Sequence, residues 1–149
     1  MKLKENNNND DLIVNIHGYD ISEINLDISF ITGPNYFFSS IKKYFFDKYK
    51  ENCTEQFLDD TNFRYIECDN NGFFNISSFP DIYFEHKEFE TIFNLTYEDL
   101  FMLDKSKNKY IFLVFNNRYT DNWVFGNLFL KKINLLLMLI QKPLAIINQ

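Results

Sequence analysis

The chain has 149 residues, enough for one domain with a substantial core, because a chain of this length buries roughly 68 to 70% of its unfolded surface. Its 15 Lys and Arg against 21 Asp and Glu give a net charge of −6 without any basic run, which argues against binding to nucleic acids or anionic membranes. Residues 1–11 are mostly Lys, Glu, Asn and Asp, so we expect a disordered tail there and no signal peptide.

The first half of the chain after that tail reads as two strands and a helix. Leu12–Ile16 alternates apolar and polar residues, which predicts a strand. Residues 21–31 predict a second extended segment that ends at a Gly-Pro break. From Phe37 to Tyr49 apolar residues recur at spacings of three and four, as in an amphipathic helix of about three turns. The polar, acidic residues 51–62 then predict a loop.

Strand patterns return in the middle of the chain. Residues 63–68 alternate again, and residues 69–72 form a strong turn signal. Pro80 suits the start of a further strand in which Ile82 and Phe84 face the same side.

The next segments predict a strand at 89–95, a helical turn and a hairpin. Thr96 and Asp99 have the spacing of a capping box before an apolar pair, which indicates a short capped helical turn. Residues 104–109 predict a hairpin loop. Residues 110–115 are almost continuously apolar, as expected for a strand that is buried on both faces.

The two cysteines, Cys53 and Cys68, form no CxxC pair and have no nearby histidine, so we expect no zinc site. Calcium-loop spacing is absent too, and no metal or other cofactor is predicted. The cysteines are either a disulfide or two free buried thiols. A disulfide is expected if the protein is secreted.

Three glycosylation sequons, at residues 52–54, 75–77 and 94–96, would also suit a secreted protein. Their number is close to what chance gives in a chain so rich in Asn, so the sequence alone assigns them no role.

Residues 26–34 carry the motif that bears most on function. An apolar residue precedes Asp27, and Ile28, a hydroxyl residue, two apolar residues and Thr-Gly-Pro follow. This stretch resembles the active-site loop in the C-terminal lobe of pepsin-like aspartic proteases, which reads apolar-Asp-Thr/Ser-Gly-Thr/Ser-Ser-Phe before a similar turn. The family's Gly and one hydroxyl residue are missing here, because Asp27 is followed directly by Ile28 and Ser29.

Two further stretches extend the resemblance. Residues 79–84 are similar to the family's Leu-Pro-Asp/Thr-Ile-x-Phe segment, which follows a cysteine as this one follows Cys68. Residues 123–132 resemble the family's Trp-Ile-Leu-Gly-Asp-x-Phe-Leu/Ile-Arg/Lys run, whose Gly permits a strand to pass close beside the catalytic loop. The family's usual partner of the cysteine falls at Tyr110. After Lys132 the resemblance stops at an atypical apolar tail, 133–149, whose leucine block is too short to cross a bilayer.

The resemblance implies that residues 12–149 form one mainly β lobe of a pepsin-like acid protease, antiparallel β with two or three short helices. Asp27 would hold the position of the catalytic acid, with Ser29, Phe30 and Thr32 as substrate-binding residues. Catalysis in this family needs two carboxylates that share a proton and activate water. The partners implied are therefore a peptide or protein substrate, and an N-terminal lobe or a second copy of the chain that supplies the other aspartate.

The resemblance also implies a location in the secretory pathway, in a lysosome or vacuole, or outside the cell. Two alternatives to a protease lobe remain open. One is a noncatalytic peptide-binding or interaction domain derived from the same fold, and the other is an unrelated small β domain with a structural role.

Overall fold

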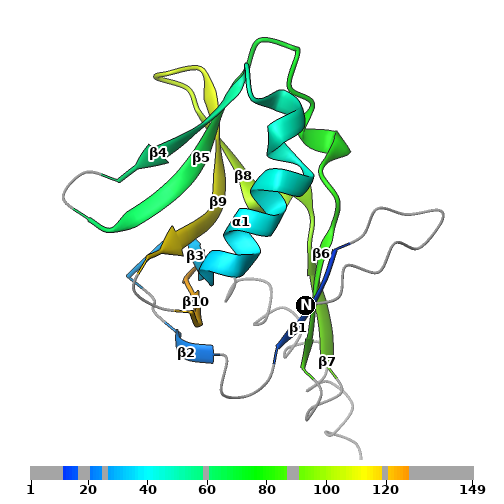
Figure 1. Ribbon diagram of the computed structural model, residues 1–149, viewed down its shortest axis with the longest axis vertical. Coiled ribbons are helices and arrows are strands. Elements are labelled where there is room, and N and C mark those ends of the chain that lie inside the picture. The colour runs from blue at the N-terminus through cyan, green and yellow to red at the C-terminus, as the bar shows by residue number, and fades with distance from the viewer. Residues whose placement is uncertain are drawn as a thin grey trace, which may run out of the picture.

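A computed structural model describes residues 12–16, 21–24, 27–58, 61–86, 91–118 and 121–127. In these residues the strands form a seven-stranded and a three-stranded sheet, accompanied by two α-helices and two short 3₁₀ helices (Figure 1). The fold is therefore mainly β, as predicted, although parallel and antiparallel pairs are mixed. The expected tails at 1–11 and 133–149 lie outside the described residues.

The larger sheet contains the Asp27 loop. Its strands are β2 (Ile21–Ile24), β3 (Ile31–Gly33), β4 (Cys53–Phe57), β5 (Phe63–Asp69), β8 (Phe101–Asp104), β9 (Lys109–Asn117) and β10 (Trp123–Phe125). They lie in the order β2-β10-β3-β9-β5-β4, and β8 also pairs with β9. β10 runs parallel to β2 and antiparallel to β3, and β3 runs parallel to β9. The remaining pairs are antiparallel.

The smaller sheet consists of β1 (Leu12–Ile16), β6 (Ile82–His86) and β7 (Thr91–Leu95), in the order β1-β6-β7. β1 and β6 are parallel, and β6 and β7 are antiparallel. Ile82 and Phe84 are completely buried while Tyr83 between them is half-buried, which confirms the predicted alternation after Pro80.

The first helical region departs from the single predicted helix. α1 (Asn35–Tyr44) buries Phe37, Phe38 and Ile41, but it ends at Tyr44 with Phe45 as its C-cap, and a 3₁₀ helix, η2 (Phe46–Tyr49), follows. Phe45 and Phe46 are adjacent and both buried, and the tighter turn lets both rings enter the core.

The second helical region confirms the predicted capped turn. α2 (Tyr97–Leu100) follows Thr96, and the Asp99 carboxylate accepts hydrogen bonds from the Thr96 backbone N–H and hydroxyl. A second 3₁₀ helix, η3 (Ile76–Ser78), lies between β5 and β6.

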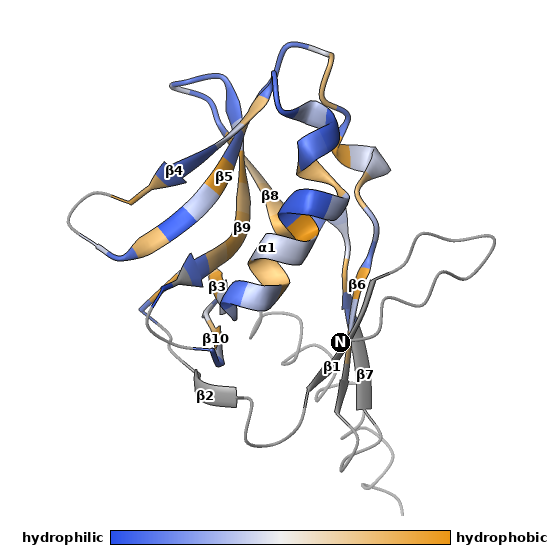
Figure 2. Ribbon diagram, viewed as in Figure 1, coloured by the Kyte–Doolittle hydropathy of each residue, from blue (hydrophilic) through white to orange (hydrophobic). Residues whose placement is uncertain are grey.

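The core is dominated by aromatic rings between α1, the larger sheet and the smaller sheet. α1 lies over one face of the larger sheet (Figure 1), and the smaller sheet packs against β10 through Phe84, whose ring contacts Trp123 and Phe125. Hydrophobic and hydrophilic residues are interspersed along β5 (Figure 2), and the four consecutive residues 65–68 are all buried. The central rings in mutual contact are those of Phe45, Phe46, Phe74, Phe79, Phe101 and Phe112.

Two sequence-based expectations are wrong. Residues 51–62 were expected to form a loop, but Cys53–Phe57 is the edge strand β4; an edge strand has one solvated side and tolerates polar residues. Residues 21–31 are not one continuous strand, because a turn at 27–30 separates β2 from β3. Strand β8 was not predicted.

The two cysteines form a disulfide. Cys53 and Cys68 are directly opposite each other in the β4–β5 pair, with Cα atoms 4.0 Å apart. This settles the choice between a disulfide and two free thiols, and it fastens the edge strand to the sheet.

Candidate functional site

The four residues predicted to form the site lie in, or just after, the turn between β2 and β3. Asp27 and Ser29 are exposed, and Phe30 is half-buried. Thr32 is 1% exposed and lies within β3, between β9 and β10. The fold therefore brings Asp27, Ser29 and Phe30 to one stretch of surface, whereas the Thr32 side chain lies beneath it and has almost no surface to offer a peptide.

The Thr32 hydroxyl is also unusual in its bonding. Its oxygen has no hydrogen-bond partner among the described residues, and its register neighbours are Val124 on β10 and Phe115 on β9. A buried polar group without a partner costs roughly 1–3 kcal/mol. The buried Thr32 hydroxyl therefore lowers the free energy of unfolding.

Strand β10 and the two residues after it lie against the Asp27 turn. The backbone N–H of Asn127 donates to the carbonyl of Ile28 at 2.8 Å. A Cβ atom on Gly126 would stand 2.1 Å from the Phe30 carbonyl oxygen and 2.5 Å from that of Ile28. No side chain fits between the strand and the turn, so Gly is required at 126.

A row of aromatic rings flanks the turn on the sheet face opposite α1. Phe30 stacks on Phe115 with ring centroids 4.1 Å apart, and it meets the edge of Phe63 at 5.5 Å. Tyr65 stacks on the same Phe115 ring at 5.0 Å. The intervening β5 residue, Arg64, faces α1 instead. The row fixes the Phe30 end of the turn to β5 and β9.

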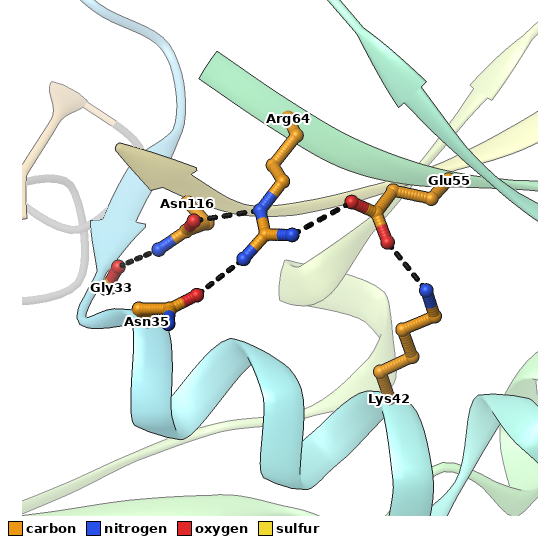
Figure 3. Close-up of polar contacts among 6 residues, drawn as sticks. All are labelled: Gly33, Asn35, Lys42, Glu55, Arg64 and Asn116. Carbon is orange, nitrogen blue, oxygen red and sulfur yellow. Dashed lines mark hydrogen bonds and ion pairs between the residues drawn. The ribbon is translucent and has the colours of Figure 1, made fainter. Parts of the chain in front are cut away.

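On the α1 face, a polar network holds the Gly33-Pro34 break that follows the turn (Figure 3). The buried Asn116 amide donates to the Gly33 carbonyl at 3.2 Å and accepts from Arg64 Nε at 2.8 Å. Arg64 also donates to Asn35 at the start of α1 and to Glu55 on β4, the latter at 2.9 Å. All three guanidinium nitrogens therefore have partners, and the network ties α1 to β3, β4, β5 and β9.

Glu55 is the anionic centre of this network. It accepts from both Arg64 and Lys42. Partial burial raises the pKa of the Glu55 carboxyl, but the hydrogen bonds and positive charges of Lys42 and Arg64 outweigh burial, so the pKa lies below its ordinary value of 4.5. The carboxylate thus stays ionised in mildly acidic solution.

Sequence reasoning missed this network. The sequence pattern predicts a loop at Glu55 and makes Arg64 only the polar residue of an alternating strand. Asn116 could have been identified from the sequence, because it directly follows an apolar run and a buried side-chain amide in such a strand needs hydrogen-bond partners.

Other site chemistries find no support in the part of the chain that the structure describes. No group of three or more His, Cys, Asp or Glu residues is arranged to hold a metal ion there. Among the same residues, no helix has the length and apolar character needed to span a membrane. In comparisons with known proteins, no family model and no curated protein matches the chain.

Proposed function

We propose that this chain is built as the C-terminal lobe of a pepsin-like aspartic endopeptidase, with Asp27 in the catalytic position, and that it does not hydrolyse peptides by itself. One observation carries the proposal. β10 lies between β2 and β3, the two strands that flank the Asp27 turn, and Gly126 lies against the turn. The resemblance of residues 123–132 implies such a strand beside the catalytic loop.

The position of Tyr110 adds support. In the resembled family the cysteine equivalent to Cys68 pairs with a cysteine at the place of Tyr110. Here Tyr110 and Cys68 are directly opposite each other in the β5–β9 pair, so this register is compatible with that family bond. The chain instead joins Cys68 to Cys53, its neighbour on the other side.

Two features of the turn explain the proposed lack of activity. Hydrolysis in this family needs two carboxylates that share a proton, and the proposed lobe contributes one of them, Asp27. In addition, Ile28 stands where the family has a small residue followed by Gly. The Ile28 Cγ1 atom is 2.9 Å from the position of a Cβ on Gly126, and the Ile28 carbonyl accepts a hydrogen bond from the Asn127 N–H. The shortened turn is therefore packed directly against the end of β10.

The same closed turn favours a second candidate, a noncatalytic peptide-binding domain of this fold. Such a domain would keep the exposed Asp27, Ser29 and half-buried Phe30 as contacts but would need no water-activating geometry. The two candidates differ in whether restoring the missing parts creates a protease.

The experiment measures hydrolysis of acid-unfolded haemoglobin, first by the purified chain and by Asp27→Ala. We expect no hydrolysis by either. The second arm inserts Thr-Gly after Asp27 and supplies an N-terminal lobe of a pepsin-like protease; hydrolysis should appear, be blocked by a statine-containing transition-state mimic, and vanish with Asp27→Ala.

Two outcomes would contradict the proposal. Hydrolysis by the unmodified chain that is lost with Asp27→Ala would refute inactivity and point to a homodimer with two copies of Asp27. No hydrolysis by the repaired, complemented chain, together with binding of the statine peptide by the unmodified chain, would favour the peptide-binding domain.

The proposed location is the secretory pathway or an acidic or extracellular compartment. The disulfide between Cys53 and Cys68 supports it, because such bonds persist in oxidising compartments.

A further inference from the structure

The three Asn-x-Ser/Thr sequons differ sharply in their surroundings. Asn52 is half-buried and directly precedes the disulfide-bonded Cys53. Asn94 is half-buried in β7, and its Nδ2 donates to Asp81 Oδ2 at 3.2 Å. Asn75 alone of the three is exposed, in the segment between β5 and β6. A glycan on Asn94 would have to take the second hydrogen of an amide nitrogen that is half-buried and already bonded to Asp81, and one on Asn52 would start from a half-buried side chain next to the disulfide.

The side-chain oxygen of Asn75 accepts hydrogen bonds from Ser77, the third residue of the same sequon. Oδ1 accepts from the Ser77 backbone N–H at 3.1 Å and from the Ser77 hydroxyl at 2.7 Å. The amide nitrogen Nδ2 donates to no atom of the described residues. Phe74 and Phe79, 4% and 3% exposed, fasten the segment to the core on both sides. Asn75 therefore presents its nitrogen from a fixed, outward part of the backbone.

A glycan on Asn75 would lie close to an exposed hydrophobic side chain. Phe73, two residues before Asn75, is 76% exposed, the largest exposed fraction among the large hydrophobic residues described. A bulky, solubilising glycan on Asn75 would shield this ring from association with other proteins.

We propose that Asn75 is an N-glycosylation site and that the sequons at Asn52 and Asn94 stay unmodified. The donor is an oligosaccharide linked to a lipid pyrophosphate. The Asn75 Nδ2 forms a bond to the anomeric carbon, the bond from that carbon to the pyrophosphate oxygen breaks, the amide loses one proton to a base, and the lipid pyrophosphate leaves. This inference rests on the proposed location in the secretory pathway, which the disulfide supports because such bonds persist in oxidising compartments.

The test directs the full chain into the endoplasmic reticulum of a eukaryotic cell and measures the gel mobility shift that a peptide-N-glycosidase removes. We expect a single shift step, lost in Asn75→Gln and in Ser77→Ala. The matched variant Ser77→Thr keeps the sequon and should keep the shift, as should Asn52→Gln and Asn94→Gln. Mass spectrometry should find Asn75 converted to Asp after enzymatic removal of the glycan.

Two results would overturn the proposal. One is a shift that persists in Asn75→Gln. The other is the absence of any shift in a chain whose cysteines have become unreactive to maleimide, since formation of the disulfide shows that the chain entered and folded in the compartment.

Discussion

At the scale of single residues, two positions beside Asp27 have opposite effects on stability. Gly126 is needed because two backbone carbonyls occupy the space of its side chain, whereas Thr32 buries a hydroxyl that has no hydrogen-bond partner in the described part of the chain. Both positions flank the proposed catalytic turn, so each can be tested by its effect on the free energy of unfolding.

Gly126→Ala should destabilise the chain by about 3 kcal/mol, because its Cβ would meet backbone atoms that cannot move away without breaking the sheet. Gly72→Ala is the matched control. Gly72 has φ +85° and open space around it, so only the backbone conformation is penalised, by about 1 kcal/mol. Urea unfolding measures both. Equal losses would mean that β10 does not press against the turn.

Thr32→Val should leave the free energy of unfolding unchanged or raise it by about 1 kcal/mol, because an isosteric methyl replaces a hydroxyl without a partner. Thr61→Val should instead lower it by about 1 kcal/mol. The Thr61 hydroxyl donates to the Leu58 carbonyl and accepts from the Phe63 N–H. A clear loss of stability in Thr32→Val would show that the hydroxyl has a partner.

At the scale of elements, the edge strand β4 depends on a covalent bond. Among the strands that the structure describes, β4 pairs with β5 alone, and its residues include exposed Thr54 and Phe57. An edge strand of this composition gains little from burial, so the bond from Cys53 to Cys68 supplies much of its attachment.

Replacing both cysteines by Ala should lower the free energy of unfolding by about 3 kcal/mol, the chain-entropy value for a closed loop of about fifteen residues. Hydrogen exchange of the β4 amides should accelerate more than that of β9. Reducing the native chain with dithiothreitol should produce the same loss. Unchanged stability on reduction would contradict a structural role for the bond.

At the scale of the whole molecule, the network around Arg64 joins α1 to four strands of the larger sheet (Figure 3). Its anion, Glu55, has a lowered pKa in the folded chain. The unfolded chain therefore binds more protons near pH 4.5 than the folded chain does.

The network's contribution to stability should accordingly be complete above pH 4.5 and be lost as the pH falls through the lower pKa of the folded state. Glu55→Gln should be less stable than the unmodified chain at neutral pH and should lose less stability on acidification. Thermal unfolding between neutral pH and pH 3 measures the difference. Parallel pH profiles for the two proteins would refute the assignment.

Local patterns in the sequence were sufficient for much of the fold. The strands at β1, β5, β6 and β9 and the capped turn of α2 were predicted, because alternation and capping depend on neighbouring residues only. Strand β4 was not predicted, because its place in the larger sheet depends on pairing with β5 and on a disulfide. The end of the helix at Phe45 was not predicted either, because it depends on how two adjacent rings pack into an aromatic cluster formed by residues distant in the sequence.

For the candidate site, the sequence by itself determined that Asp27, Ser29 and Phe30 share one short turn, since they are adjacent in the chain, and that the family's Gly is missing. The resemblance of residues 123–132 already implied a strand beside this turn. Only the tertiary structure decided that β10 pairs with both β2 and β3, that Thr32 is buried, and that Arg64 supports the break after the turn. The reason is physical: burial and hydrogen bonding at any one residue depend on which strands lie on either side of it, and sequence periodicity does not contain that information.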